Sequence, residues 1–231
     1  DGVLLTGLSA SESVSAVEAS DIPTVLIAAE CSRRSNITII NTDAAAIGRQ
    51  TASHIISSGS YETFACVLPE YPSAFSLSCA KAFAVEVKRH SGNCIFLSEN
   101  LSALVTMKKP VAVFALNDDL ASSTINECRK LKLSVPDDVA IIGFGNDAMT
   151  CENHRPTISS VEPDFEKQGY LAAMHLERMM SARTASPRIE ESVGIKRIIS
   201  RGSTHKVPNN ESLVRRAMVF IKANIREPIC V

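Results

Sequence analysis

Short apolar runs and helical stripes alternate along the chain. Seven runs of four to six residues consist mainly of apolar and β-branched side chains, and most of them are continuous rather than alternating. Continuous runs of this length are typical of strands that are buried on both faces of a sheet. The predicted strands are residues 3–6, 24–28, 37–41, 63–68, 94–97, 111–116 and 139–144.

Between these runs, apolar residues recur at helical spacing. One stripe follows Asp43 and stops at Gly59, a second follows Asp118, and a third follows Asp164. We expect all three aspartates to cap helices, because a carboxylate in this position accepts a hydrogen bond from a free backbone N–H group. The stripes contain Ile47, Thr51, Ile55 and Ile56; Leu120, Thr124, Ile125, Cys128 and Leu131; and Phe165, Gly169, Ala172, Ala173, Leu176, Met179 and Met180.

Alternating strands and helices predict an α/β fold with doubly wound, mostly parallel sheets. In such sheets, ligands bind beyond the carboxyl ends of the strands. Residues 201–212 (RGSTHKVPNNES) interrupt the pattern with polar and turn-forming residues, and we interpret them as a linker. Residues 213–223 then form an amphipathic helical pattern, which we interpret as the opening of a further domain.

Composition and charge agree with a globular protein. Apolar residues make up 45% of the 231 residues, charged residues 21%, and the formal net charge is −1. This balance gives no overall electrostatic signal for binding to nucleic acid or to a membrane. The seven cysteines are odd in number and lack C-x-x-C spacing. They predict reduced, mostly buried thiols in a cytoplasmic protein rather than disulfides or a zinc site.

The chain lacks the sequence signals of a catalyst. The GFGND stretch at 143–147 lacks the third glycine of a dinucleotide fingerprint, and there is no G-x-x-x-x-G-K-[ST] loop. The five histidines are scattered without metal-ligand spacing, and His175 is interpreted as a partly exposed helix residue. We therefore expect no enzymatic activity, no cofactor and no metal ion.

Stretches along nearly the whole chain resemble the sensor domains of LacI/GalR-type transcription regulators and their periplasmic-binding-protein relatives. Residues 212–231 (SLVRRAMVFIKANIREPICV) resemble the start of an AraC-type helix-turn-helix domain, an arrangement similar to that of xylose-regulator (XylR) type activators. The sensor-like stretches, in the family's order, are DGVLLTGL (1–8), IPTVLI (22–27), NTDAAAIGRQTASHI (41–55), FALNDDLA (114–121), VPDDVAIIGFGND (135–147), RPTISSVEPDFEKQGYLAA (155–173) and RGST (201–204).

The resemblance implies a two-lobed clamshell that binds a sugar between its lobes and works as a homodimer. DNA contact is expected only through a domain missing from this chain, and the first lobe is expected to lack its usual N-terminal βα units. A periplasmic sugar-binding protein of a transporter is the alternative with the same fold. Two divisions of the chain are expected: an effector-binding domain over 1–206, and a linker with an incomplete AraC-type domain over 207–231. Within the effector-binding domain, the first lobe is expected at about 1–42 and 161–198. The second lobe is expected at about 43–160 and 199–205.

Candidate ligand contacts follow the ends of predicted strands. Asn117 and Asp118 come directly after the run 111–116, Asn146 follows 139–144, and Glu30 follows 24–28. Carboxamides and carboxylates have two hydrogen-bonding arms, which suits sugar hydroxyls. Asp118 is expected to cap the helix that follows, and whether it also contacts the ligand is open.

The loop 69–75 (PEYPSAF) follows the run 63–68 and is expected to face the same site. Its Tyr71 and Phe75 either stack on a sugar ring or pack on the surface. Two positions depart from what the resemblance implies. Cys79, which we keep as a lining residue, replaces a usual arginine, and Gly145 replaces a usual aspartate. Loss of one such charged hydrogen bond costs about 1.5–3 kcal/mol, so the identity of the ligand is open.

Overall fold

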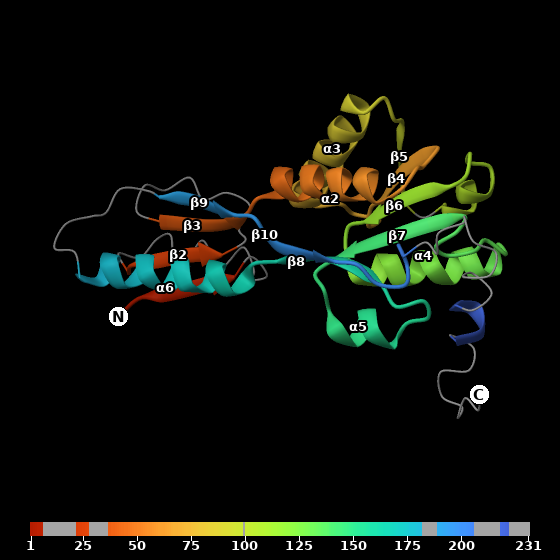
Figure 1. The fold of residues 1–231 in the computed structure, drawn as a ribbon. Coiled ribbons are helices and arrows are strands. Elements are labelled where there is room, and N and C mark those ends of the chain that lie inside the picture. The colour runs from red at the N-terminus through yellow and green to blue at the C-terminus, as the bar shows by residue number, and fades with distance from the viewer. Residues whose placement is uncertain (7–21, 28–36, 99, 182–188, 206–217, 222–231) are drawn as a thin grey trace.

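The computed structural model describes residues 1–6, 22–27, 37–98, 100–181, 189–205 and 218–221, and these build two sheets (Figure 1). The smaller sheet is parallel and has the order β1-β2-β3-β9. Its strands are β1 Val3–Thr6, β2 Thr24–Ile27, β3 Ile37–Thr42 and β9 Glu190–Val193.

The larger sheet has six strands in the order β10-β8-β7-β6-β4-β5. All of its pairs are parallel except β10 with β8. Its strands are β4 Thr63–Val67, β5 Cys94–Leu97, β6 Val111–Ala115, β7 Val139–Phe144, β8 Ser159–Pro163 and β10 Ile195–Ile199.

Helices cover both faces of the larger sheet (Figure 1). On one face, α2 (Ala44–Ser58) and α3 (Ala74–Arg89) pack against the strands through a core that includes Ile47, Phe83 and Phe114. On the other face, α4 (Asp118–Lys130), α5 (Ala148–Asn153) and the short 3₁₀ helix η1 (Leu101–Val105) enclose a second core with Leu104, Ile125 and Ile141. The two cores explain why the central strands β4, β6 and β7 are continuous apolar runs.

Helix α2 lies unusually close to α3. A Cβ atom added at Gly48 would be 2.2 Å from the carbonyl oxygen of Cys79 and 2.7 Å from the backbone nitrogen of Phe83. Glycine is therefore the residue that allows the two helix backbones to approach this closely.

In the smaller sheet, α6 (Phe165–Ser181) packs on one face through Ala172. The predicted stripe was only partly right, because four of its seven residues are exposed: Phe165, Gly169, Ala173 and Met180. The buried line of α6 instead includes Gln168 and His175. His175 is thus not the partly exposed residue that we expected, and its Nε2 lies 3.1 Å from Glu191 Oε2 on β9. Polar side chains with partners across the interface hid this line from a search for apolar spacing.

All seven predicted strands are confirmed, with ends that differ by at most one residue. The sequence pattern missed β8, β9, β10 and helix α3. Because α3 begins at Ala74, Phe75 lies in its first turn and not in the predicted loop 69–75, and Ser73 caps the helix by accepting a hydrogen bond from the Ser76 backbone N–H over 3.1 Å. In the tail, the described residues 218–221 are helical, and the rest of the predicted helix 213–223 lies outside the described residues.

Two of the three predicted caps are confirmed. The Asp43 carboxylate accepts a hydrogen bond from the Ala46 N–H over 2.8 Å, and the Asp164 carboxylate accepts one from the Lys167 N–H over 3.1 Å. The prediction for α4 was wrong, since its N-cap is Asn117 and not Asp118.

Within the described residues, the chain crosses between the sheets after β3, after β8 and between β9 and β10. The Asp43 N–H donates to the Val193 carbonyl over 2.8 Å, so two of these crossings touch each other. Strands β8 and β10 both belong to the larger sheet, although 161–198 was expected in the first lobe. The lobe limits stay a prediction. Among the described helices, none combines the length and the apolar character needed to cross a membrane.

Candidate functional site

The loops that carry most of the candidate residues leave the larger sheet at one edge. Strands β4, β6, β7 and β8 run parallel, so their carboxyl ends lie side by side. Strand β8 passes from this edge to α6 and the smaller sheet, and α2 begins there before running back to the start of β4. We call this edge, with residues 68–73, 116–117 and 145–147, the carboxyl edge. It is where ligands bind in open parallel sheets.

Asn117 and Asp118 lie at this edge in different surroundings. Asn117 is exposed, and its Oδ1 accepts a hydrogen bond from the Leu120 N–H over 2.7 Å. Asp118 is only 4% exposed. Of the consecutive polar residues in the sequence NDD, the first has the extended backbone that an N-cap needs, and the second is already helical.

The carboxylate of Asp118 joins three elements. Its Oδ2 accepts a hydrogen bond from the Asp147 N–H over 2.7 Å, and its Oδ1 accepts one from the Ser160 hydroxyl over 2.6 Å. The start of α4 is thereby fixed to the loop after β7 and to β8. Hydrogen bonds to a buried carboxylate are among the strong ones, so Asp118 stabilises the carboxyl edge from within. Its direct contact with a ligand stays a prediction.

Asn146 is held on two sides. Its backbone N–H donates to the Ser160 hydroxyl over 3.0 Å, and its side-chain Oδ1 accepts a hydrogen bond from Arg201 Nη2 over 2.8 Å. The backbone of Asn146 has a φ of 55°, a left-handed conformation in which asparagine is enriched. The sequence reasoning missed Arg201, which lies 55 residues further along the chain. The RGST stretch was the only signal that marked it.

Gly145 precedes Asn146 with a φ of +122°, in the region that favours glycine. A Cβ atom at this position would lie 3.3 Å from Asp118 Oδ2. An aspartate there, as the family resemblance led us to expect, would be strained and would add a second negative charge beside Asp118.

We therefore expect Gly145→Asp to lower the free energy of unfolding by about 2 kcal/mol, mostly through backbone strain. Urea denaturation measures this change. Gly145→Ala is the matched variant, because it has the same strain without the charge, and the difference between the two isolates the repulsion. Equal stability of Gly145→Asp and the unchanged chain would contradict the expectation.

The aromatic candidates behave differently from each other. Tyr71 is 84% exposed in the loop after β4. Phe75 is half-buried, and its ring lies 5.6 Å from the ring of Phe144 at the end of β7. Tyr71 therefore offers an open aromatic face, while Phe75 is also part of the packing between α3 and the sheet. Stacking of either ring on a sugar stays a prediction.

Cys79 is fully buried in the core between α3 and the larger sheet. It lies where α3 approaches α2 closely at Gly48. Burial, followed by the negative charge of Asp43, raises the pKa of its thiol to about 12. The group is a neutral, enclosed thiol in this structure and offers no charge to a ligand. Glu30 lies outside the described residues.

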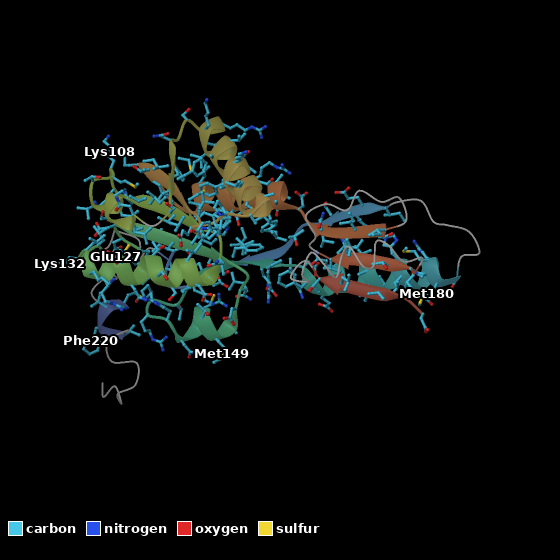
Figure 2. The ribbon with its side chains drawn as sticks, turned by 180° about the vertical axis from the view of Figure 1, so that it is seen from behind. Lys108, Glu127, Lys132, Met149, Met180 and Phe220 are labelled. Atoms are coloured by element: carbon cyan, nitrogen blue, oxygen red, sulfur yellow. The ribbon has the colours of Figure 1, made fainter. Side chains whose placement is uncertain are left out.

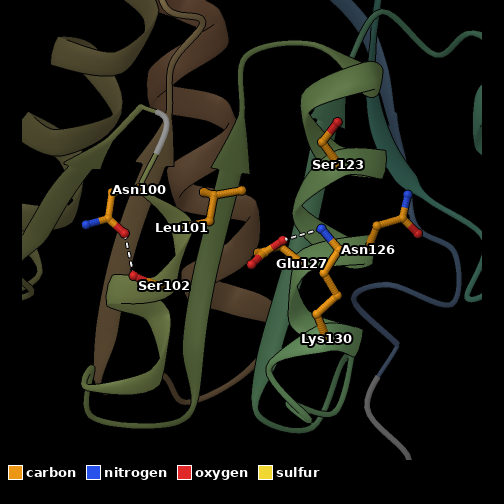
Figure 3. Close-up of a pocket in the computed structure, with 7 residues that line it drawn as sticks. All are labelled: Asn100, Leu101, Ser102, Ser123, Asn126, Glu127 and Lys130. Carbon is orange, nitrogen blue, oxygen red and sulfur yellow. Dashed lines mark hydrogen bonds and ion pairs between the residues drawn. The ribbon is translucent and has the colours of Figure 1, made fainter.

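A cavity of about 470 Å³ lies elsewhere, between η1 and α4 (Figure 3). An ion pair of 2.9 Å joins Lys130 Nζ to Glu127 Oε2 in it. Glu127 lies toward the end of α4 that is remote from the smaller sheet (Figure 2), so the cavity is separate from the carboxyl edge. It is lined by Asn100, Leu101, Ser102, Ser123, Asn126, Glu127 and Lys130, none of them a predicted contact.

The described cysteines are free thiols, and all but the half-buried Cys94 are buried, as predicted. The sulfur atoms of Cys66 and Cys94 are 3.9 Å apart, in contact without a bond. In the part of the chain that the structure describes, no three histidine, cysteine, aspartate or glutamate residues are grouped so that they could hold a metal ion.

Comparison with known proteins gives matches over most of the chain. A family model described as a periplasmic binding protein-like domain matches residues 52–204. The HTH-type transcriptional regulator DegA of Bacillus subtilis is 27% identical over 186 residues, which cover 73% of this chain and 54% of DegA. The xylose operon regulatory protein of Escherichia coli K12 is 29% identical over 119 residues, which cover 52% of this chain and 30% of that protein.

The fold also matches solved structures. A LacI family transcriptional regulator from Enterococcus faecium, solved with bound ribose, has a TM-score of 0.73 and 21% identity to this chain. The match covers 90% of this chain and 81% of that one. The predicted α/β fold with two mostly parallel sheets is confirmed. The chain spans about half the length of DegA and less than a third of the xylose operon regulatory protein.

Proposed function

Because this chain belongs to the periplasmic binding protein-like domain family, we propose that it is the ligand-sensing region of a bacterial transcription regulator. It binds a sugar or a similar small molecule at the carboxyl edge and thereby controls attached DNA-binding domains. The regulator names of the matched relatives support this function over catalysis or transport. The ribose bound to the similar Enterococcus faecium protein supports a sugar as the ligand.

The observation that carries the proposal is the position of two carboxamides. Asn117 and Asn146 lie at the carboxyl edge, at the point where the chain crosses to the second sheet. Asn117 is exposed, and its Nδ2 has no protein partner among the described residues. The carboxamides of Asn117 and Asn146 supply polar contacts, and Phe75, which packs on Phe144 at the end of β7, supplies the apolar surface that a sugar site needs.

The finer proposal concerns the whole protein. We propose that residues 207–231 begin an AraC-type DNA-binding domain, supported by their resemblance to that domain and by the match to the xylose operon regulatory protein. We also propose a homodimer in the cytoplasm. Free thiols at the described cysteines support a reducing compartment. Apart from 218–221, the tail lies outside the described residues.

Sugar binding is tested by thermal unfolding of the chain with D-ribose, D-xylose, hexoses and uronic acids. A ligand at a hundred times its dissociation constant adds about 2.7 kcal/mol to the free energy of unfolding. For a chain of this size, that raises the melting temperature by about 5–10 °C. No shift with any sugar would contradict a sugar ligand and favour an effector of another class.

A matched pair of variants locates the site. Asn117→Ser keeps a side chain that caps α4 but removes the carboxamide, so the ligand-induced shift is expected to fall while the stability without ligand changes little. Asn126→Ser makes the same change at an exposed position of α4 away from the carboxyl edge and is expected to keep the shift. Loss of the shift in both variants would argue against binding at the carboxyl edge.

A further inference from the structure

Arg201 is the least expected residue near the candidate site. Its side chain is only 14% exposed. Its Nη2 donates to Asn146 Oδ1 over 2.8 Å, and its Nη1 donates to the Ile158 carbonyl over 2.8 Å. The nearest carboxylate, that of Glu152, lies 3.7 Å away and is mostly exposed. The guanidinium is therefore held mainly by uncharged oxygens, which fix its direction.

The bond from Arg201 determines which arm of Asn146 is available. A guanidinium only donates hydrogen bonds, so the carboxamide must turn its oxygen toward Arg201. The Nδ2 group then lies on the opposite side of the carboxamide. A ligand atom that meets this arm must accept a hydrogen bond, as a hydroxyl, carbonyl or carboxylate oxygen does.

Arg201 is also the first residue of the segment 201–204, which is held against strands of the larger sheet. Ser203 is completely buried, and its hydroxyl donates to the Ile141 carbonyl over 2.6 Å. The Ser203 N–H donates to the Thr157 carbonyl over 2.9 Å. The backbone N–H of Arg201 itself donates to the Ser159 hydroxyl over 2.7 Å. Residues 201–204 are thus attached to β7 and to the start of β8.

From these contacts, we propose that Arg201 is a positioning residue that orients Asn146 for an oxygen acceptor and couples it to residues 201–204. The inference rests on the proposed ligand site. Residues 201–204 precede the stretch 207–231, with which we propose that the DNA-binding domain begins. A ligand that displaces the Asn146 carboxamide therefore also displaces Arg201, through the hydrogen bond between the two side chains. The displacement then reaches residues 201–204, at the end of the sensor region.

The coupling is tested without any ligand by amide hydrogen exchange on the full chain. The variants are Arg201→Gln, Asn146→Ala and the double variant. Arg201→Gln is expected to speed exchange at the amides of Asn146 and Asp147 about tenfold or more, since a charged hydrogen bond is lost. Asn146→Ala is expected to speed exchange at the amides of Gly202 and Ser203, and the double variant is expected to add little to the larger single effect.

Glu152→Gln is the control, because it removes only the distant ion pair and is expected to leave both sets of amides unchanged. The amides of α6, which packs on the smaller sheet, serve to detect a loss of stability throughout the molecule. Independent effects that add in the double variant, or equal acceleration at α6, would overturn the proposal. Arg201→Lys keeps the positive charge but lacks the planar guanidinium with its two donating arms. It is expected to protect the amides from exchange better than Arg201→Gln does, but less well than arginine.

A ligand measurement separates this proposal from the proposed function. If D-xylose or D-ribose shifts the melting temperature, Arg201→Gln is expected to raise the dissociation constant of that sugar about tenfold. An unchanged constant would overturn the orienting role. If neither sugar binds, the exchange experiment still decides whether Arg201 couples Asn146 to residues 201–204.

Discussion

Replacing Gly48 with alanine is expected to lower the free energy of unfolding by about 3 kcal/mol or more, the upper part of the range for overpacking. The added Cβ atom would meet the carbonyl oxygen of Cys79 at 2.2 Å and the backbone nitrogen of Phe83 at 2.7 Å. Backbone atoms within a helix cannot turn aside as a flexible side chain does. Helices α2 and α3 must therefore separate, which loosens the core around Phe83.

Gly169→Ala is the matched control for this prediction. Gly169 also lies inside a helix, α6, but a Cβ atom added there would meet nothing within 4 Å. Alanine is a better helix former than glycine, so this variant is expected to gain about 0.5–1 kcal/mol. Chemical denaturation of both variants makes the comparison. A similar change in both would show that close packing at Gly48 is not the cause.

Replacing Asp118 with alanine is expected to have a comparable effect, about 3–5 kcal/mol, because two hydrogen bonds to a buried charge are lost. The Asp147 N–H and the Ser160 hydroxyl lose the oxygens that accept their bonds. The loop at 145–147 should then lose its fixed position, and ligand binding should weaken together with stability. Denaturation and the sugar-induced thermal shift measure the two effects.

Asp119→Ala is the control for Asp118, since Asp119 is exposed in the same first turn of α4. It is expected to cost about 1 kcal/mol or less, from its interaction with the helix dipole. Asp118→Asn keeps the shape of the side chain but offers only one accepting arm, so its effect should lie between the two. If Asp118→Ala were as stable as Asp119→Ala, the conclusion that the Asp118 carboxylate stabilises the carboxyl edge would be wrong.

The fold was largely predictable in those strands whose successive side chains are all apolar and buried. Strands β4, β6 and β7 lie between two cores, so their sequences contain little else than apolar residues. Strand β8 escaped prediction because its buried residues include Ser159 and Ser160, which bond to other segments. Strands β9 and β10 are only partly buried and carry charges, which hides the strand pattern.

The site was less predictable than the fold. The ends of β6 and β7 identified Asn117, Asp118 and Asn146 as neighbours at one edge, and this is where the structure places them. The difference between the exposed Asn117 and the buried Asp118 depends on Asp147 and Ser160, which lie 29 and 42 residues away from Asp118. Patterns among neighbouring residues do not reveal contacts between residues so far apart in the sequence. The role of Arg201 was missed for the same reason.

The pairing of β3 with β9 has a consequence for the newly made chain. Ile39 lies opposite Glu190 in the register, so the pair closes a loop of about 150 residues, which carries an entropic cost. Chains are made from the N-terminus and tend to fold as they emerge. The region from α2 to β8 is complete on the ribosome while the backbone of β3 still has an uncovered edge, a known starting point for aggregation. The smaller sheet therefore gains its strand β9 only after the strands β4 to β8 of the larger sheet have been made.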